Sequence, residues 1–144
     1  MNNLPPLLST ALWSCRRFMS RLRWSLSKAV STRDQPNGRI AYLKHEGKSL
    51  AAYGAAAKGN TMLNFCGITS KGIAFVADRS PHKHGKLTPG AHVPVVPAED
   101  LVKLQPEVTL LLAWNFADEI LSQQVVYRET GEKFLIPIPE VRMI

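Results

Sequence analysis

From residue 49 onward, short apolar runs alternate with amphipathic stretches. The runs typical of buried strands are "SLAAY" (49–53), "GIAFVAD" (72–78), "HVPVVP" (92–97), "EVTLLLAW" (107–114) and "EKFLIPIP" (132–139). The stretches with the apolar spacing of helices are 58–66, 98–105 and 115–130. Strands that alternate with helices require right-handed crossovers, which give a mostly parallel sheet covered on both faces. The sequence therefore predicts an α/β fold, a Rossmann-like three-layer sandwich.

The first third of the chain does not follow this alternation. Residues 31–47 are polar and contain Pro36-Asn37-Gly38, which is typical of a turn.

In the helix that follows the first strand, we expect Asn60 or Thr61 near the N-cap and Met62, Leu63 and Phe65 facing inward. The predicted parts are a basic amphipathic helical segment over 1–33, a linker over 34–45 and the Rossmann-like domain over 46–144.

Residues 11–30, "ALWSCRRFMSRLRWSLSKAV", have an amphipathic pattern of their own, with Arg17, Arg21 and Lys28 opposite an apolar face. Three interpretations stay open. The helix docks on another part of a larger protein, it lies on a membrane or targets an organelle, or it is not native protein structure. No apolar run is long enough to span a bilayer. Membrane contact through residues 11–30 is the weaker alternative.

The positive charge is concentrated at the beginning of the chain. Of the formal net charge of +7, residues 1–33 supply +6 with no acidic side chain, and residues 34–144, with 12 basic and 11 acidic side chains, supply +1. A nearly neutral domain lacks the field that attracts nucleic acid, so nucleic acid is not an expected partner. The two cysteines fit neither a disulfide framework nor a zinc site, which favours a reducing, cytoplasmic compartment.

The stretch "AAYGAAAKGNTMLNFCGI" (51–68) places two glycines and a lysine between the first strand and its helix. Gly54 and Gly59 allow a tight turn with exposed N–H groups, the helix adds its positive end, and Lys58 adds a full charge. A diphosphate would be favoured there. The spacing G-x-x-x-x-G-N matches neither the dinucleotide nor the Walker pattern, so a plain strand-to-helix turn remains the alternative.

Other polar residues also fall at the predicted carboxyl ends of strands. Asp78 stands where nucleotide-binding folds place an acid on the ribose, or it is a strand-end turn residue. Trp114 is a core residue or a ligand platform, and capping explains the polar residues that follow it. No carboxylate or cysteine completes a metal site with the loop histidines, so we predict no metal at His82, His84 and His92. The loop that carries them is expected to be solvated, and a role in gripping the substrate is the alternative.

Four ordered blocks within residues 46–141 resemble one known family. The blocks "AYGAAAKGNTMLNFCGI", "DRSPHKHGKLTPGAHVPVV", "LLLAWNFADEI" and "FLIPIPEV" are similar to the C-terminal domain of S-adenosylmethionine-dependent sugar C-methyltransferases. In that family a zinc-binding segment and a methyl-donor domain precede this Rossmann-like domain, which helps to hold a nucleotide-linked keto-sugar. The resemblance implies removal of a proton beside a ketone and attack of the enolate carbon on the donor methyl group.

The resemblance also implies what this chain lacks. It has no cysteine cluster for zinc, no separate glycine-rich donor loop and no counterpart of the family's acid–base residues, so it looks like a separated or truncated last domain. We expect no catalytic residue and no cofactor bound by this chain, with S-adenosylmethionine as the donor of the full-length family. The expected partners are a nucleotide-diphosphate sugar and a methyl-donor domain or chain.

The residues expected to bind the substrate follow from the same blocks. The glycine bend would line the diphosphate, and the later segments would approach the nucleoside or the hexose. The set comprises Gly54, Ala55, Lys58, Gly59, Asn60, Asp78, Lys83, Gly90, Trp114 and Asn115. Two other classes of function remain alternatives: a stand-alone nucleotide-binding module without methyl transfer, and a membrane-associated protein that uses its basic N-terminal helix.

Overall fold

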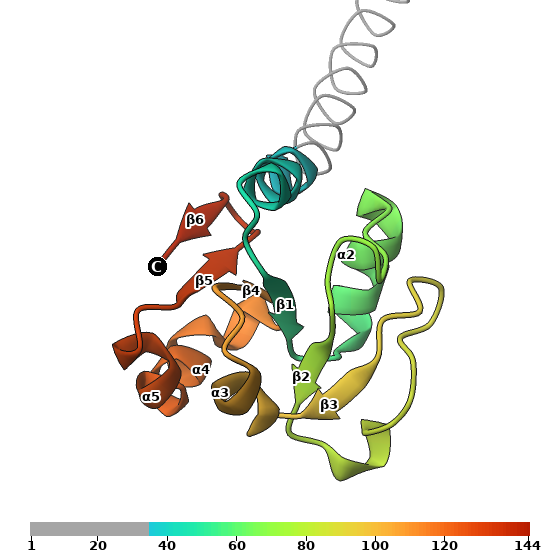
Figure 1. Ribbon diagram of the computed structural model, residues 1–144. Helices are drawn as coiled ribbons and strands as arrows, with labels where there is room; N and C mark the ends of the chain where they lie inside the picture. Colours follow the sequence, from blue (N-terminus) through green and yellow to red (C-terminus); the bar gives the residue numbers. More distant parts are fainter. Residues whose placement is uncertain (1–34) are drawn as a thin grey trace, which may run out of the picture. The chain divides into compact units, whose positions relative to one another are not determined.

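A computed structural model describes residues 35–144, which contain one six-stranded sheet in the order β3-β2-β1-β4-β5-β6 (Figure 1). The first five strands in chain order pair in parallel, and β6 runs antiparallel to β5. The strands are β1 (Leu50–Tyr53), β2 (Val76–Asp78), β3 (Val95–Pro97), β4 (Val108–Leu111), β5 (Lys133–Ile136) and β6 (Arg142–Met143).

Helices cover both faces of this sheet. The helices after β1 are α2 (Ala57–Cys66), α3 (Asp100–Leu104), α4 (Ala117–Gln123) and α5 (Val125–Glu129), with 3-10 turns η1 (Pro81–Lys83) and η2 (Trp114–Phe116). The side chains of α2 pack in one buried cluster with one face of the sheet, and those of α3, α4 and α5 pack in a second cluster with the other. The predicted α/β three-layer sandwich is therefore confirmed.

Alternation along the strands divides the core between the two faces. In β1, Leu50 and Ala52 belong to the cluster under α2, whereas Ala51 and Tyr53 belong to the cluster under α3, α4 and α5. All four residues are buried, as expected for a central strand of a parallel sheet. The carboxyl end of β1 is thus packed on both faces of the sheet.

Residues 35–45 are a helix and not the predicted linker with a turn. Its buried residues, Pro36, Ile40 and Leu43, recur with helical spacing, and the last two join the cluster under α2. A proline is tolerated in the first turn of a helix, and packing of an apolar face outweighs the cost of Gly38, about 1 kcal/mol. The side-chain amide of Asn37 donates to the carbonyl oxygen of Cys66 at 2.6 Å, which ties this helix to α2.

Helix α2 begins earlier than the sequence predicted. Its N-cap is Ala56, whose side chain makes no capping bond, so neither Asn60 nor Thr61 caps the helix. Met62 and Leu63 are buried as predicted, but Phe65 is 51% exposed, so the inward orientation predicted for Phe65 is wrong. The shift places Lys58 and Gly59 in the first helical turn instead of the preceding loop.

The last third of the chain departs from prediction in two places. The helix expected over 115–130 is divided into η2, α4 and α5, with a break at Gln124. The strand β6, which follows the predicted last strand and pairs with it, was not predicted. With only two residues, β6 is too short to show a period in the sequence.

The basic amphipathic segment predicted over residues 1–33, with its helix over 11–30, lies outside the described residues. Among the helices of residues 35–144, none has both the length and the hydropathy required to cross a bilayer.

Candidate functional site

Strand order reverses between β1 and β4, the point at which open α/β sheets bind ligands. Gly54 follows β1 with φ of 89°, and a Cβ there would lie 2.8 Å from the Cβ of Ala113, beyond the end of β4. Only glycine tolerates both this positive φ and so close a neighbour. Glycine at position 54 therefore allows the segments that follow β1 and β4 to lie in contact. Two cavities adjoin this junction, one on each side of it.

The first cavity lies at the beginning of α2 and measures about 280 Å³. The exposed side chain of Lys58 lines it from the first turn of the helix, and Trp114 and Asn115 line it from η2. The remaining lining residues are Ala56, Ala57, Leu112, Ala113 and Phe116. This cavity brings together three of the predicted site residues.

The second cavity, of about 300 Å³, lies between the strand ends and α4. Tyr53, Gly54, Asp78 and Arg79 line it from the sheet side. The other lining residues are Ala113, Phe116, Glu119, Ile120 and Gln123. Burial raises the pKa of Tyr53, so its phenol is neutral at ordinary pH. The two cavities share Ala113 and Phe116 as lining residues, so they adjoin one another.

Most N–H groups of the glycine bend are already bonded within the protein. Those of Gly54 and Ala56 donate to carbonyl oxygens of Ala77 and Gly54, both at 2.8 Å, and that of Ala55 donates to Asp78 at 2.7 Å. The expectation that the bend exposes its own N–H groups to a ligand is therefore wrong. The donors without an intrahelical acceptor belong instead to the first turn of α2, at Ala57, Lys58 and Gly59.

Gly59 has a packing role that the sequence did not reveal. A Cβ at this position would lie 2.6 Å from the Cβ of Leu112, next to β4. The absence of a side chain lets α2 lie directly against the sheet, which is the role of the third glycine in the dinucleotide fingerprint. Gly59 thus positions the beginning of α2 at the first cavity without lining it.

Asp78 joins the loops that follow β1 and β2. Its Oδ2 accepts from the N–H of Ala55 at 2.7 Å, and its Oδ1 accepts from the N–H of Ser80 at 2.7 Å. Lys83 donates to Asp78 Oδ2 at 3.3 Å and to the carbonyl oxygen of Ala55 at 3.0 Å. His84 Nε2 lies 2.7 Å from the carbonyl oxygen of Asp78. This geometry gives Asp78 and Lys83 a structural role, and the ribose contact of Asp78 stays a prediction.

Several other predicted site residues do not line either cavity. A Cβ at Gly90, whose φ is 77°, would lie 2.1 Å from Oδ1 of Asn64, so Gly90 packs against the middle of α2. Asn60 lies in α2 as well, and its buried Oδ1 has no hydrogen-bond partner among the described residues. The side chain of Ala55 is buried in the core. Binding roles for these residues remain untested predictions.

The structure places Trp114 at the edge of the core and two of the three loop histidines at the surface. Trp114 is partly buried and packs against both core clusters, although its edge lines the first cavity. His82 and His92 are exposed, and His84 is partly buried. Within residues 35–144, no group of three or more His, Cys, Asp and Glu side chains gathers in a way that could hold a metal ion.

The second cavity also brings together three side chains that were not predicted as site residues, Arg79, Phe116 and Gln123. Phe116 is 62% exposed at the wall shared with the first cavity. Arg79 Nη1 donates to Gln123 Oε1 at 3.0 Å, although the two residues lie far apart in sequence. The signal that was available is a phenylalanine inside the polar stretch "NFADE", directly after a buried strand.

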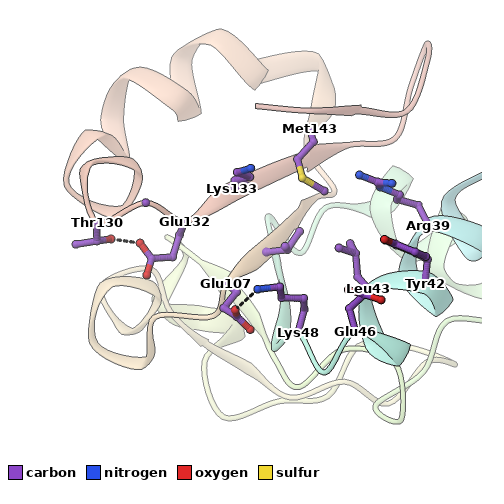
Figure 2. A pocket seen from close by; sticks show the side chains of 12 residues that line it. Arg39, Tyr42, Leu43, Glu46, Lys48, Glu107, Thr130, Glu132, Lys133 and Met143 are labelled. Atoms are coloured by element: carbon purple, nitrogen blue, oxygen red, sulfur yellow. Dashed lines mark hydrogen bonds and ion pairs between the residues drawn. The ribbon is translucent and has the colours of Figure 1, made fainter.

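A third cavity, of about 420 Å³, lies at the opposite edge of the sheet, at the amino ends of β1, β4 and β5. Lys48 Nζ lies 2.7 Å from Glu107 Oε1 at this cavity. Figure 2 marks the pair with a dashed line, between the side chains of the helix over 35–45 and Glu132. This hydrogen bond raises the pKa of Lys48 and lowers the pKa of Glu107. Three acidic and three basic side chains line the cavity, so it offers no net field to an anion. The larger volume therefore does not identify the ligand site.

The fold and the two cavities at its strand-order reversal define an open α/β domain with a candidate ligand site at the carboxyl edge of the sheet. A model of the family described as "C-methyltransferase C-terminal domain" matches residues 22–139. The chain belongs to this family. The match begins upstream of the predicted domain boundary at residue 46 and includes the helix over 35–45, in keeping with the burial of that helix in the core.

A curated relative supports this assignment. The chain is similar to C-methyltransferase NovU of Streptomyces niveus, with 40% identity over 99 residues. That alignment covers 69% of this chain and 24% of the relative. The chain therefore spans about a quarter of the length of the curated relative that it matches.

Proposed function

We propose that this domain binds the nucleotide-linked keto-sugar substrate of an S-adenosylmethionine-dependent C-methyltransferase. In this proposal the diphosphate of the substrate lies in the first cavity, against the beginning of α2 and Lys58. The proposal depends on the position of Lys58 at the reversal between β1 and β4, next to first-turn N–H groups of α2 that have no acceptor within residues 35–144. Family membership supports the reaction class.

The chemistry of this corner suits a diphosphate. The first turn of a helix carries a partial positive charge, and its N–H groups point along the axis toward an anion. Lys58 adds a flexible ammonium group with three donors, and its exposed side chain has no ion-pair partner among the described residues. Asn115, exposed across the cavity, supplies an amide that can bond a phosphate or a sugar hydroxyl.

We also propose that S-adenosylmethionine does not bind to the described residues as a second ligand. A donor site on such a sheet would require the acid after β2 to hold ribose hydroxyls. Both oxygens of Asp78 instead accept bonds from the protein, and Lys83 covers one of them. We therefore assign the methyl donor and the acid–base groups to polypeptide outside the described residues, either in the same chain or in a partner chain.

A thermal-shift and calorimetry experiment with nucleoside diphosphates tests the proposal. We expect millimolar nucleoside diphosphate to raise the Tm of the 144-residue chain by selective binding to the folded state. Lys58→Ala should weaken binding about 10-fold or more, because a charge-assisted hydrogen bond contributes about 1.5–3 kcal/mol.

Lys133→Ala is the matched control, since Lys133 is an exposed lysine at the opposite edge of the sheet. Its affinity for nucleoside diphosphate should equal that of the unsubstituted chain. Equal losses in the two variants would indicate nonspecific attraction of an anion. The absence of any shift at millimolar ligand would refute the proposal.

A further inference from the structure

One face of the helix over 35–45 is exposed at the third cavity and carries three residues in a stripe. Arg39, Tyr42 and Glu46 are exposed, and each of them lines this cavity. Their spacing of three and then four residues places them on the same face of a helix. The N–H of Glu46 donates to the carbonyl oxygen of Tyr42 at 3.0 Å, so the helical pattern continues to Glu46. The stripe therefore has a cation at one end, an aromatic ring at its centre and an anion at the other end.

The two charged ends of this stripe have no ion-pair partner among residues 35–144. The ion pairs in this part of the chain are formed by other side chains. The guanidinium carbon of Arg39 lies 5.5 Å from the centroid of the Tyr42 ring, a contact that holds the cation on this face of the helix. Arg39 and Glu46 are thus both available to a charge of opposite sign on another molecule.

The surface around the stripe has the composition of a protein–protein interface. Tyr42 is 54% exposed, and Met143 lines the same cavity from β6. Tyrosine, methionine and arginine are enriched at such interfaces, where an apolar centre is surrounded by a polar rim. Figure 2 shows the stripe on one side of the cavity and Glu132 and Lys133 on the other. Because the cavity has as many acidic as basic side chains, its best electrostatic match is a surface that also carries both signs.

A second copy of this chain offers such a surface. In a two-fold dimer the same patch meets itself, so a contact between two different positions occurs twice. Arg39 and Glu46 lie about 4.5 and 6 Å along the helix axis on either side of Tyr42, at about 1.5 Å per residue. Two such helices packed antiparallel, with the axis beside Tyr42, place Arg39 of each copy opposite Glu46 of the other. One interface thus contains two pairs of opposite charge and covers both exposed rings.

From these observations we infer that the exposed face of the helix over 35–45 at the third cavity is an interface between two copies of this chain, related by a two-fold axis beside Tyr42. The inference is independent of the proposed function. Lys58 and the first cavity lie at the carboxyl edge of the sheet, and this face lies at the amino edge. Two copies joined at their amino edges leave the first cavity of each copy open.

Sedimentation equilibrium of the 144-residue chain tests the inference. We expect the average mass to rise from one chain toward two between about 1 µM and about 1 mM protein, the range of small interfaces. Arg39→Glu and Glu46→Arg each place like charges opposite one another twice, so each variant should weaken self-association about 10-fold or more. Tyr42→Ala removes the ring at the axis without a change of charge and should also weaken self-association.

An equimolar mixture of Arg39→Glu and Glu46→Arg distinguishes a two-fold interface from any other contact. The first variant carries an acid at both positions and the second carries arginine at both, so one molecule of each forms two pairs of opposite charge. The mixture should therefore associate about as tightly as the unsubstituted chain, although neither variant does so alone.

The matched controls are Lys86→Glu and Asp118→Arg, which make the same reversals of charge at exposed residues that do not line the third cavity. Phe65→Ala is the control for Tyr42→Ala, since Phe65 is a comparably exposed ring, 51% exposed, outside this cavity. All three controls should associate as tightly as the unsubstituted chain.

Three results would overturn the interface: a chain that stays monomeric at about 1 mM, losses in the controls equal to those in the stripe variants, or a mixture that does not recover association. The affinity of Arg39→Glu and Glu46→Arg for nucleoside diphosphate should equal that of the unsubstituted chain. Loss of the interface therefore leaves the proposed function standing, and failure of nucleoside diphosphate to bind leaves the interface standing.

Discussion

The Cβ position of Gly59 lies 2.6 Å from the Cβ of Leu112, so the first turn of α2 touches the segment that follows β4. The same position lies 3.3 Å from the carbonyl oxygen of Leu112 and 3.4 Å from that of Gly54. These neighbours are a Cβ and two backbone atoms, which cannot move away by a change of rotamer. The contact therefore sets the distance between the first cavity and the sheet.

Replacement of Gly59 by alanine should destabilise the domain, although alanine is the better helix former. Overpacking costs about 1–3 kcal/mol, and the gain in helix propensity offsets at most about 1 kcal/mol of that cost. We expect a net loss of about 1 kcal/mol or more in urea unfolding, together with weaker binding of nucleoside diphosphate. Gly38→Ala is the control, because its Cβ would meet nothing within 4 Å in the described part of the chain. That variant should be unchanged or more stable, and a stable Gly59→Ala would contradict the contact.

Asp78→Asn should separate the loops that Asp78 joins. An amide replaces one accepting oxygen with a donor, so the N–H of either Ala55 or Ser80 loses its acceptor. Since an unsatisfied buried donor costs about 1–3 kcal/mol, we expect a loss of that size in urea unfolding. The control is Asp100→Asn, which breaks the 2.9 Å pair with Lys103 on the surface of α3 and should cost less than about 1 kcal/mol. Equal losses in the two variants would show that Asp78 is not a structural residue.

Leu43→Ala tests whether the helix over 35–45 is part of the core. Leu43 is 6% exposed and belongs to the cluster under α2, so its truncation should cost about 2–5 kcal/mol. Tyr42→Ala, on the exposed side of the same helix, removes a ring that Arg39 approaches to 5.5 Å and should cost less than about 1 kcal/mol. If thermal unfolding gives the two variants the same Tm, the helix is peripheral after all.

The fold class was predictable because apolar runs of strand length and amphipathic stretches alternate through most of the domain. The helix over 35–45 escaped prediction because its helical spacing involves few apolar residues and a strong turn signal stands at its beginning. Pro36-Asn37-Gly38 favours a turn by local propensity, and only burial of Ile40 and Leu43 under α2 reverses that preference. Phe65 is exposed for a different reason, because the buried residues of α2 follow helical spacing and Phe65 falls outside the face formed by Gly59, Met62, Leu63 and Cys66.

The candidate site was predictable in its location but not in the roles of its residues. The glycine bend and Trp114 were expected at the carboxyl ends of strands because strands and helices alternate along the sequence. In the structure these two segments lie at the reversal between β1 and β4. Asp78 joins two loops, and Gly59 packs on Leu112. Both roles depend on distances in the folded chain that the spacing of residues in the sequence does not contain. The same is true of Arg79 and Gln123, which meet across the second cavity.

Tyr127 links α5 to β4 through a buried hydroxyl. The ring is fully buried and meets Phe134 edge to face at 5.2 Å. Its hydroxyl lies 2.8 Å from Thr109 Oγ1 and also donates to the carbonyl oxygen of Pro106. Burial raises the pKa of Tyr127 to about 12, above the value near 10 expected for an unfolded tyrosine. The folded state thus favours the protonated form.

This shift predicts a loss of stability at alkaline pH. A group whose pKa rises on folding contributes its full stability below the unfolded pKa, and that contribution is lost as pH rises from about 10 through about 12. Tyr127→Phe should be less stable by about 1–3 kcal/mol at pH 7, because Thr109 and Pro106 lose a partner. The difference in free energy of unfolding between Tyr127→Phe and the unsubstituted chain should become smaller above pH 10. Urea unfolding at pH 8, 10 and 11 would measure it. Phe134→Leu disturbs the same ring contact but leaves the Tyr127 hydroxyl in place. Its difference in free energy of unfolding from the unsubstituted chain should therefore not change with pH. A Tyr127→Phe difference that is equally constant would show that this hydroxyl does not titrate on unfolding.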